Sequence, residues 1–258
     1  MLDIEFLTHY KAKKDLLNGK VILITGAGRG IGRSVALACA RHGATVILCG
    51  RTVEKLNAVY DEIEAAGWPQ AAIFPVNFES AGEADFQALA TAIENEFGQL
   101  DGLLHNAAEL GQCTPLDMYH APTWQKVMQV NVNAPFLLTK ALLPLLRKST
   151  SASIIFTGDE VGLKGRAYWG AYAISKAALE NMRQILADEL DGVSAIRVNS
   201  INPGPVRTDL RTTAFPGEDP NSLPAPDDVV MPYLFLLGAD SQLITGEQID
   251  IKPLTSHA

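Results

Sequence analysis

Cysteine and histidine are scarce in this chain, and neither is arranged as a metal site or a disulfide framework. The cysteines are Cys39, Cys49 and Cys113, and the five histidines form no HExxH or paired pattern. An odd number of cysteines without a CxxC spacing favours free thiols in a reducing compartment. The sequence therefore predicts no metal site.

Long apolar runs and dense basic runs are also absent. No stretch approaches the roughly 18 uninterrupted apolar residues that indicate a membrane span. The first residues carry acids where a secretory signal would have an apolar segment. With 29 Asp and Glu against 21 Lys and Arg, the net charge is −8, which on average repels nucleic acid and acidic membrane surfaces. We therefore expect a cytoplasmic protein that binds neither nucleic acid nor membrane.

The sequence does contain a regular alternation of short apolar runs and segments with helical periodicity. Strands that alternate with helices of ten or more residues form βαβ units with a parallel sheet. The expected fold class is α/β, a three-layer Rossmann fold in which helices cover both faces of a doubly wound parallel sheet. The predicted strands are residues 21–25, 45–49, 71–76, 103–105, 153–157 and 195–201, and the predicted helices are 31–42, 53–66, 86–97, 124–146 and 172–190.

The chain has no internal repeat and no long linker, so residues 1–258 are predicted to form a single nucleotide-binding domain. Residues 1–18 precede the first strand and are expected to form an N-terminal extension, either a helix or an arm. Residues 212–228 follow the sixth strand and are rich in proline, glycine and acids. Because long loops at the carboxyl ends of parallel strands often cover substrate, this segment is a candidate lid.

A glycine-rich motif, TGAGRGIG, follows the first strand directly and opens the next helix. Its glycines allow a sharp turn and a close backbone approach to a pyrophosphate, and the helix N-terminus offers free N–H groups to the anion. Glycine turns between strand and helix also occur for packing alone, but the strand, spacing and helix together favour a dinucleotide site. The candidate cofactor residues in this motif are Gly26, Arg29, Gly30, Ile31 and Gly32.

The end of the second strand indicates which dinucleotide is bound. NAD-binding proteins usually place a carboxylate there to accept the ribose hydroxyls. This chain instead has Gly50 followed by Arg51. An arginine offers a charge-assisted fork to a 2′-phosphate, and Arg29 adds a second cation. The sequence predicts NADP(H) in preference to NAD(H), although Arg51 could also be a surface residue beside a helix.

Tyr172 and Lys176 lie four residues apart on a predicted helix and therefore on one face of it. A free tyrosine has a pKa near 10, and a neighbouring ammonium is expected to lower it. Tyr172 could then exchange a proton with a substrate oxygen while a hydride moves to or from a nicotinamide. A YxxxK pair by chance is usually a surface contact, but its place downstream of the glycine motif favours catalysis.

The glycine motif and the YAISK segment resemble those of the short-chain dehydrogenase/reductase family, and the likeness extends from about residue 20 to about residue 250. The resemblance implies an oxidoreductase that interconverts a small-molecule carbonyl and a secondary alcohol, in a homodimer or homotetramer paired through the two long helices. It assigns Asn131 to a water-mediated proton relay with Lys176. It also assigns Asn77 and Phe78 to the adenine, Asn106 and Ala107 to the adenine ribose, Pro203, Gly204, Val206 and Thr208 to the nicotinamide end, and Tyr172 and Lys176 to cofactor binding as well as catalysis.

Asp159 departs from the family pattern, because it stands thirteen residues before Tyr172, where the family has a catalytic serine. A serine hydroxyl donates a hydrogen bond to the developing oxyanion, whereas an ionised carboxylate can only accept one. Losing such a donor typically costs about 10²–10³ in rate. A protonated Asp159, Thr157 in its place or a substrate with its own donor could preserve the enzyme. The alternatives are an NADP(H)-binding regulatory or scaffold protein with impaired catalysis, or an Asp159 paired on the rim with Lys164 or Arg166.

Overall fold

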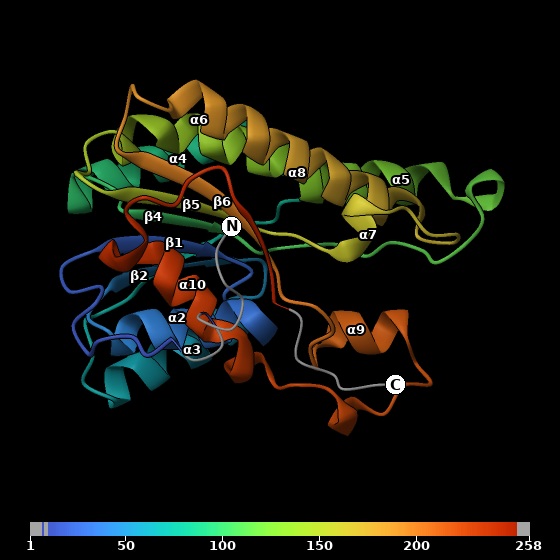
Figure 1. Ribbon diagram of the computed structural model, residues 1–258, viewed down its shortest axis with the longest axis horizontal. Coiled ribbons are helices and arrows are strands. Elements are labelled where there is room, and N and C mark those ends of the chain that lie inside the picture. Colours follow the sequence, from blue (N-terminus) through green and yellow to red (C-terminus); the bar gives the residue numbers. More distant parts are fainter. Residues whose placement is uncertain (1–6, 8–9, 252–258) are drawn as a thin grey trace.

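The computed structural model describes residue 7 and residues 10–251, and these residues form one parallel sheet in the order β3-β2-β1-β4-β5-β6-β7. Helices cover both of its faces (Figure 1), which confirms the predicted three-layer, doubly wound fold. The strand order reverses between β1 and β4, where sheets of this kind open a crevice at their carboxyl ends. The strands are β1 Val21–Thr25, β2 Thr45–Gly50, β3 Ala72–Pro75, β4 Gly102–His105, β5 Ala152–Thr157, β6 Ile196–Asn202 and β7 Gln248–Asp250.

Each strand predicted from the sequence is present, with both of its ends within one residue of the prediction. The apolar runs mark these strands because both faces of the sheet are covered: Ile22 and Ile24 pack on one side and Leu23 on the other. The sequence did not predict β7, which is three residues long and pairs with β6 at the edge of the sheet. Only Ile249 of β7 is fully buried, so its sequence carries no apolar run.

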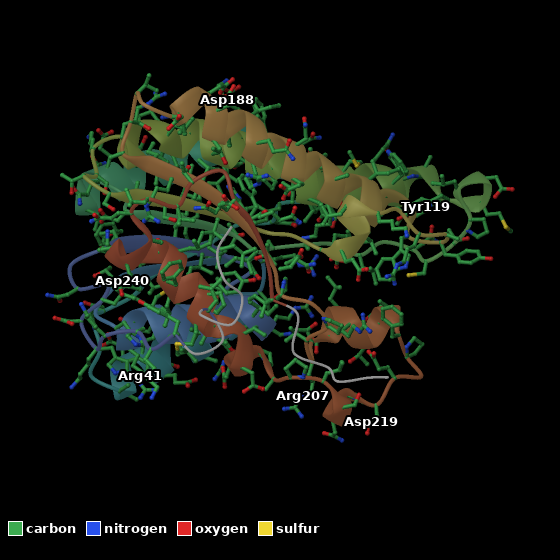
Figure 2. All side chains as sticks on the ribbon, viewed as in Figure 1. Arg41, Tyr119, Asp188, Arg207, Asp219 and Asp240 are labelled. Atoms are coloured by element: carbon green, nitrogen blue, oxygen red, sulfur yellow. The ribbon has the colours of Figure 1, made fainter. Side chains whose placement is uncertain are left out.

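The helices form two layers, each with its own hydrophobic core. Helices α2, α3 and α10 lie on one face of the sheet, and α4, α6 and α8 lie on the other (Figure 1). Figure 2 shows Asp188 on the outer side of α8 and Arg41 on the outside of the opposite layer. The helices are α2 Gly30–Arg41, α3 Val53–Ala65, α4 Glu83–Phe97, α5 Ala121–Met128, α6 Ala134–Leu146, α7 Glu160–Leu163, α8 Gly170–Leu190, α9 Asp209–Ala214 and α10 Val230–Leu237.

The single helix predicted over residues 124–146 is instead divided into α5, a π-helical segment at Gln129–Asn133, and α6. Pro135 explains the division, because it has no amide hydrogen to donate to the carbonyl of Asn131 four residues earlier. A π turn accommodates such an interruption without ending the helical path, and π turns often occur at functional sites.

The N-terminal extension and the candidate lid each contain some defined structure. Of the N-terminal extension, residues 1–6 and 8–9 lie outside the described residues, and residues 10–18 form turns and irregular chain with no helix. In the candidate lid, residues 212–214 complete α9, and short 3₁₀ turns follow at Pro220–Ser222 and Pro226–Val229. The candidate lid therefore contains short helical turns, and its role as a lid stays a prediction.

Membrane-spanning helices and metal-binding clusters are both absent from the described residues. No helix among them is long and apolar enough to cross a bilayer. No group of three or more His, Cys, Asp or Glu side chains among them is placed to hold a metal ion.

Leu89 on α4 tests the packing of the layer that contains α8. Its side chain is 1% exposed, whereas that of Leu243 is 96% exposed. We expect Leu89→Ala to lower the free energy of unfolding by about 2–5 kcal/mol, because it leaves a cavity in a packed core. Leu243→Ala should change it by no more than about 0.5 kcal/mol. Urea unfolding of both variants measures the difference, and equal values would contradict the assigned core.

Candidate functional site

A cavity of about 510 Å³ lies at the carboxyl ends of the central strands, between the glycine motif after β1 and the N-terminal part of α8. It gathers residues that are up to 200 positions apart in the chain, from Gly26 to Pro226. Of the residues predicted from the sequence, Gly32 and Asn131 are not part of its wall. The predicted residues that do line it are Gly26, Arg29, Gly30, Ile31, Arg51, Asn77, Phe78, Asn106, Ala107, Tyr172, Lys176, Pro203, Gly204, Val206 and Thr208.

The glycine motif forms a cradle that side chains would fill. Gly26 has a φ of 68°, in the left-handed region that favours glycine. A Cβ on Gly32 would lie 2.3 Å from the carbonyl oxygen of Gly26, so Gly32 has a packing role beneath the cradle. The Thr25 hydroxyl accepts hydrogen bonds from the backbone N–H groups of Asn106 at 2.9 Å and Ala107 at 3.0 Å. These contacts hold the loop after β4 against the cradle.

Positive side chains gather at the glycine end of the cavity. Arg51, which precedes α3, and Lys55, in the first turn of α3, both line it. No hydrogen bond or ion pair within the described part of the chain occupies either of them. Arg29 is paired with Asp209 at 2.8 Å, in an exposed contact across the cavity mouth. Lys55 was missed from the sequence, although its position four residues after Arg51 was an available signal.

At the opposite end of the cavity, Tyr172 and Lys176 project from α8 toward the end of β5. The Tyr172 hydroxyl donates a hydrogen bond to Oδ2 of Asp159 at 3.1 Å. The Lys176 ammonium donates to the carbonyl oxygen of Thr157 at 2.7 Å and lies 5.5 Å from the centre of the Tyr172 ring. Both side chains are buried, with 4% exposure each. The structure therefore brings the predicted tyrosine–lysine pair together with Asp159.

The pKa of Tyr172 is shifted in the direction opposite to the one predicted from the sequence. Burial, with smaller contributions from the charge and the hydrogen bond of Asp159, raises the pKa of Tyr172 well above 10. Burial lowers the pKa of Lys176 to about 8, although the Asp159 carboxylate opposes that shift. The prediction that the ammonium lowers the pKa of Tyr172 is therefore wrong in this arrangement, because burial and the carboxylate dominate.

The contacts of Asp159 exclude two of its sequence interpretations. Its Oδ1 accepts the backbone N–H of Val161 at 3.1 Å and so caps the N-terminus of α7. It pairs with neither Lys164 nor Arg166; the latter instead holds Glu160 at 2.9 Å. The Thr157 hydroxyl lies 3.4 Å from that of Tyr233, within the core. Thr157 is therefore not placed to supply the donor that a serine would.

Asn131 lies in the π-helical segment and is 1% exposed. Its side chain accepts the backbone N–H of Glu109 at 2.8 Å and donates to the Glu109 carbonyl at 2.9 Å. It also donates to the Ser175 hydroxyl at 2.9 Å, on the helix that carries Tyr172 and Lys176. Asn131 thus ties the loop after β4 to α8, and its relay role stays a prediction.

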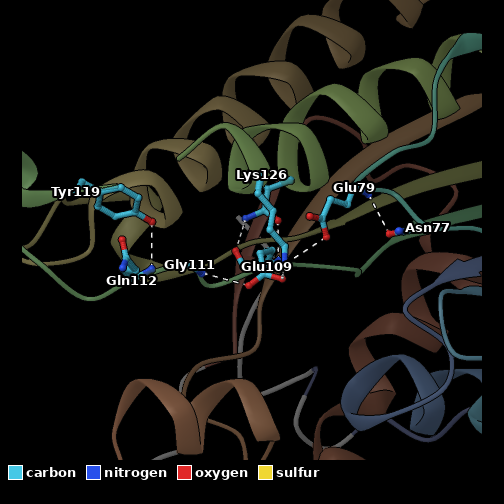
Figure 3. Close-up of polar contacts among 8 residues, drawn as sticks. Asn77, Glu79, Glu109, Gly111, Gln112, Tyr119 and Lys126 are labelled. Atoms are coloured by element: carbon cyan, nitrogen blue, oxygen red, sulfur yellow. Dashed lines mark hydrogen bonds and ion pairs between the residues drawn. The ribbon is translucent and has the colours of Figure 1, made fainter. Parts of the chain in front are cut away.

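An ion-pair cluster on the cavity wall was not predicted from the sequence. Lys126 of α5 lies between Glu79 at 3.3 Å and Glu109 at 3.5 Å (Figure 3). All three side chains are partly exposed, so the pairs contribute modestly to stability. Figure 3 also shows the Tyr119 hydroxyl, which accepts the backbone N–H of Gln112 at 3.1 Å. The cluster and this bond fix the loop after β4 along the cavity.

The mouth of the cavity near Tyr172 is largely apolar. The Trp169 ring lies 5.8 Å from that of Tyr172 and 5.6 Å from that of Phe215, which belongs to the candidate lid. The Arg211 guanidinium lies 3.7 Å over the Phe215 ring and forms two 2.6 Å hydrogen bonds to Glu218. The lid segment therefore meets the wall beside Tyr172 through tilted aromatic rings.

Comparisons with known proteins show the family to which this chain belongs. The model of the short chain dehydrogenase family matches residues 20–219. The chain is 49% identical to the uncharacterized oxidoreductase YciK of Escherichia coli K12 over 245 residues, which covers 95% of this chain and 96% of that protein. The chain belongs to the short chain dehydrogenase family and is an oxidoreductase of that kind.

Solved structures give the same result. A short chain dehydrogenase from Pseudomonas syringae superposes with a TM-score of 0.93 at 51% identity, covering 98% of this chain and 100% of that one. A short chain dehydrogenase from Escherichia coli CFT073, complexed with NADPH, superposes with a TM-score of 0.91 at 50% identity, covering 94% and 100%.

The buried ammonium of Lys176 predicts a specific pH dependence of stability. The unfolded chain keeps this proton to a pH near 10.5, whereas the folded chain loses it above about 8. The unfolded state therefore binds more protons between these values, and this lysine makes the fold more stable as the pH rises through them.

We expect the unfolding free energy of wild type to rise relative to that of Lys176→Met as the pH increases above about 8. The slope should be at most about 1.4 kcal/mol per pH unit. Urea unfolding over that range measures it, and a difference independent of pH would show that the ammonium is not buried as described.

Proposed function

We propose that this protein is an NADP(H)-dependent oxidoreductase that interconverts a carbonyl and a secondary alcohol, with Tyr172 as the acid and base. One observation carries the proposal: the Tyr172–Lys176 pair and the glycine cradle line the same cavity. The relatives support the oxidoreductase class, since they include YciK and other short chain dehydrogenases. A purely regulatory or scaffold role has no comparable support, because the paired tyrosine and lysine would then serve no chemistry.

The residues of the cavity fit NADP(H). The cradle of Gly26 and Gly30 leaves room for a pyrophosphate against the N-terminus of α2. Arg51 and Lys55 are cations without an acidic partner in the described residues, which suits a 2′-phosphate. The relative complexed with NADPH is 50% identical to this chain and supports the same choice.

We assign the remaining lining residues as the resemblance implies. Asn77 and Phe78 would contact the adenine, and Asn106 and Ala107 the adjacent ribose. The nicotinamide end would rest on the loop after β6, which contributes Pro203, Gly204, Val206 and Thr208. The bound nicotinamide supplies or accepts the hydride.

The protein's own residues handle the proton. At neutral pH Tyr172 is a neutral phenol, since its pKa lies well above 10, and this is the form that donates a proton when a carbonyl is reduced. The Lys176 ammonium is fixed by the Thr157 carbonyl beneath the Tyr172 ring, where its charge stabilises a tyrosinate after the transfer. Asn131 holds α8 and the loop after β4 at the spacing this arrangement needs.

We also propose that the protein acts as a homodimer or homotetramer paired through α6 and α8. These helices carry apolar side chains that are about half exposed within one chain. They are Phe136 at 52%, Ile174 at 42% and Ile185 at 50%. A second copy that covers them would remove apolar surface from water.

Arg51→Ala tests the choice of dinucleotide. Losing a charge-assisted contact of about 1.5–3 kcal/mol should weaken NADPH binding about 10- to 100-fold and leave NADH binding unchanged. Arg41→Ala, on the exposed far end of α2 (Figure 2), is the matched control and should alter neither affinity. Titration calorimetry measures both cofactors. Equal losses for NADPH and NADH would reject the contact with the 2′-phosphate.

Tyr172→Phe tests the proton-transfer role. Removing the hydroxyl should lower kcat for reduction of a panel of ketones by about 10²–10⁴ while the affinity for NADPH is retained. Tyr168→Phe is the control, since Tyr168 is 59% exposed and does not line the cavity. NADPH oxidation followed by absorbance gives the rates. Unchanged turnover in Tyr172→Phe would remove Tyr172 from the mechanism.

A further inference from the structure

The polar partner of Tyr172 at the reacting end of the cavity is a carboxylate. Both oxygens of Asp159 accept hydrogen bonds: Oδ1 from the N–H of Val161 and Oδ2 from the hydroxyl of Tyr172. Acceptance at both oxygens is the behaviour of an ionised carboxylate. A substrate atom that meets the Tyr172 hydroxyl therefore also meets a negative charge.

This charge has opposite effects on two kinds of hydride acceptor. Reduction of a ketone develops negative charge on the carbonyl oxygen, which the Asp159 carboxylate repels. Reduction of a protonated C=N group starts from a cation, which the carboxylate attracts and whose N–H it can accept. A hydroxyl elsewhere on a ketone would satisfy the carboxylate but would leave the repulsion of the oxyanion in place.

The hydrogen bond of Tyr172 points to the same substrate class. Its proton is directed at Asp159 at 3.1 Å, so delivering it to a carbonyl oxygen requires that bond to be broken. A substrate that arrives already protonated needs no proton from Tyr172. In that reaction the bond between Tyr172 and Asp159 can stay intact and hold the carboxylate in place.

Resting on the proposed NADP(H)-dependent function, we propose that the preferred substrates are apolar compounds with a protonated C=N group, an iminium, which the Asp159 carboxylate binds. Hydride adds to the iminium carbon, forming a C–H bond. The electron pair of the C=N π bond moves onto nitrogen, giving a neutral amine, and NADPH becomes NADP⁺. The positive charge passes from the substrate to the nicotinamide, and no proton is taken from the protein.

The wall around Asp159 sets the rest of the substrate's chemistry. Val161 and Tyr172 line the cavity and belong to one apolar cluster, against which the lining residues Trp169 and Leu210 pack. Glu160, the residue that follows Asp159, is held by Arg166 at 2.9 Å. A flat apolar ring with one cationic C=N group matches such a wall.

The direct test compares two flat bicyclic substrates with NADPH, the cyclic imine 3,4-dihydroisoquinoline and the ketone 1-tetralone. Wild type should show kcat/KM at least about tenfold higher for the imine. Asp159→Ser should reverse the preference, since it removes the charge and restores a donor. Asp159→Asn, similar in size but neutral, should lose the imine preference as well. Ser and Asn both keep the capping of α7, so these variants are expected to fold.

Two further variants test whether the substrate preference depends on the charge of Asp159 in particular. Asp188→Asn removes an exposed carboxylate on the outer side of α8 (Figure 2) and should leave the ratio of the two kcat/KM values unchanged. Tyr172→Phe should abolish tetralone reduction but keep most of the imine reduction. A loss of both activities to the same degree in Tyr172→Phe would contradict the iminium route.

A binding measurement gives a readout that does not depend on turnover. By calorimetry, the cation 1,2,3,4-tetrahydroisoquinolinium should bind wild-type protein at least about tenfold more tightly than Asp159→Ser. Neutral 1-tetralol should bind the two proteins equally. Equal binding of the cation to both proteins would overturn the assignment of Asp159.

The outcomes also distinguish this inference from the proposed function. If wild type and Asp159→Ser both reduce tetralone better than the imine, the inference fails and the proposed function stands. If only Asp159→Ser is active, and only on the ketone, both fail, because the wild-type protein then lacks the activity proposed for it. If neither protein oxidises NADPH with either substrate, the proposed function and the inference both fail.

Discussion

In the proposed mechanism, the hydrogen bond between the Tyr172 hydroxyl and the Asp159 carboxylate controls the chemistry of the site. It joins α8 to the segment that follows β5, and both partners lie where the central strands end. A substrate here meets a carboxylate beside a neutral phenol, because burial, with smaller contributions from Asp159, raises the pKa of Tyr172 well above 10. The glycine cradle, the cations and the lid determine what enters the cavity, whereas this pair determines which reacting group is stabilised there.

The surrounding structure holds this pair through buried polar contacts. The carbonyl of Thr157, at the end of β5, accepts a hydrogen bond from Lys176 and so positions the lysine. Asp159, two residues later, positions Tyr172. Asn131 reaches α8 from the π-helical segment through Ser175. The Lys176–Thr157 and Asn131–Ser175 bonds are buried, so they lie in a low-dielectric environment in which a misplaced polar group would be costly. The site is therefore stiff where the chemistry takes place.

The fold was predictable because burial on both faces imposes one pattern on every central strand. The limits of that pattern appear at β7, which is too short for an apolar run, and at Pro135, whose missing amide hydrogen turns one predicted helix into three segments. The cradle was predictable as well, since this glycine spacing directly between a strand and a helix is typical of a dinucleotide site.

The electrostatics of the site could not be read from the sequence. Spacing placed Lys176 beside Tyr172, but it could not show that the ammonium donates to Thr157 and that Asp159 receives the phenol proton. The pairing of Arg166 with Glu160 in place of Asp159 depends on how the chain turns after β5. The Glu79–Lys126–Glu109 cluster joins three segments that no sequence motif connects.

The ionisation of Tyr172 itself tests the central claim most directly. Ultraviolet difference titration of wild type against a variant that lacks the Tyr172 hydroxyl isolates its tyrosinate absorbance. The account predicts that this tyrosine titrates above a pH of about 10, and that neutralising Asp159 lowers the pKa of Tyr172. A pKa of Tyr172 below 10 in the wild-type protein, unchanged when Asp159 is replaced, would contradict it.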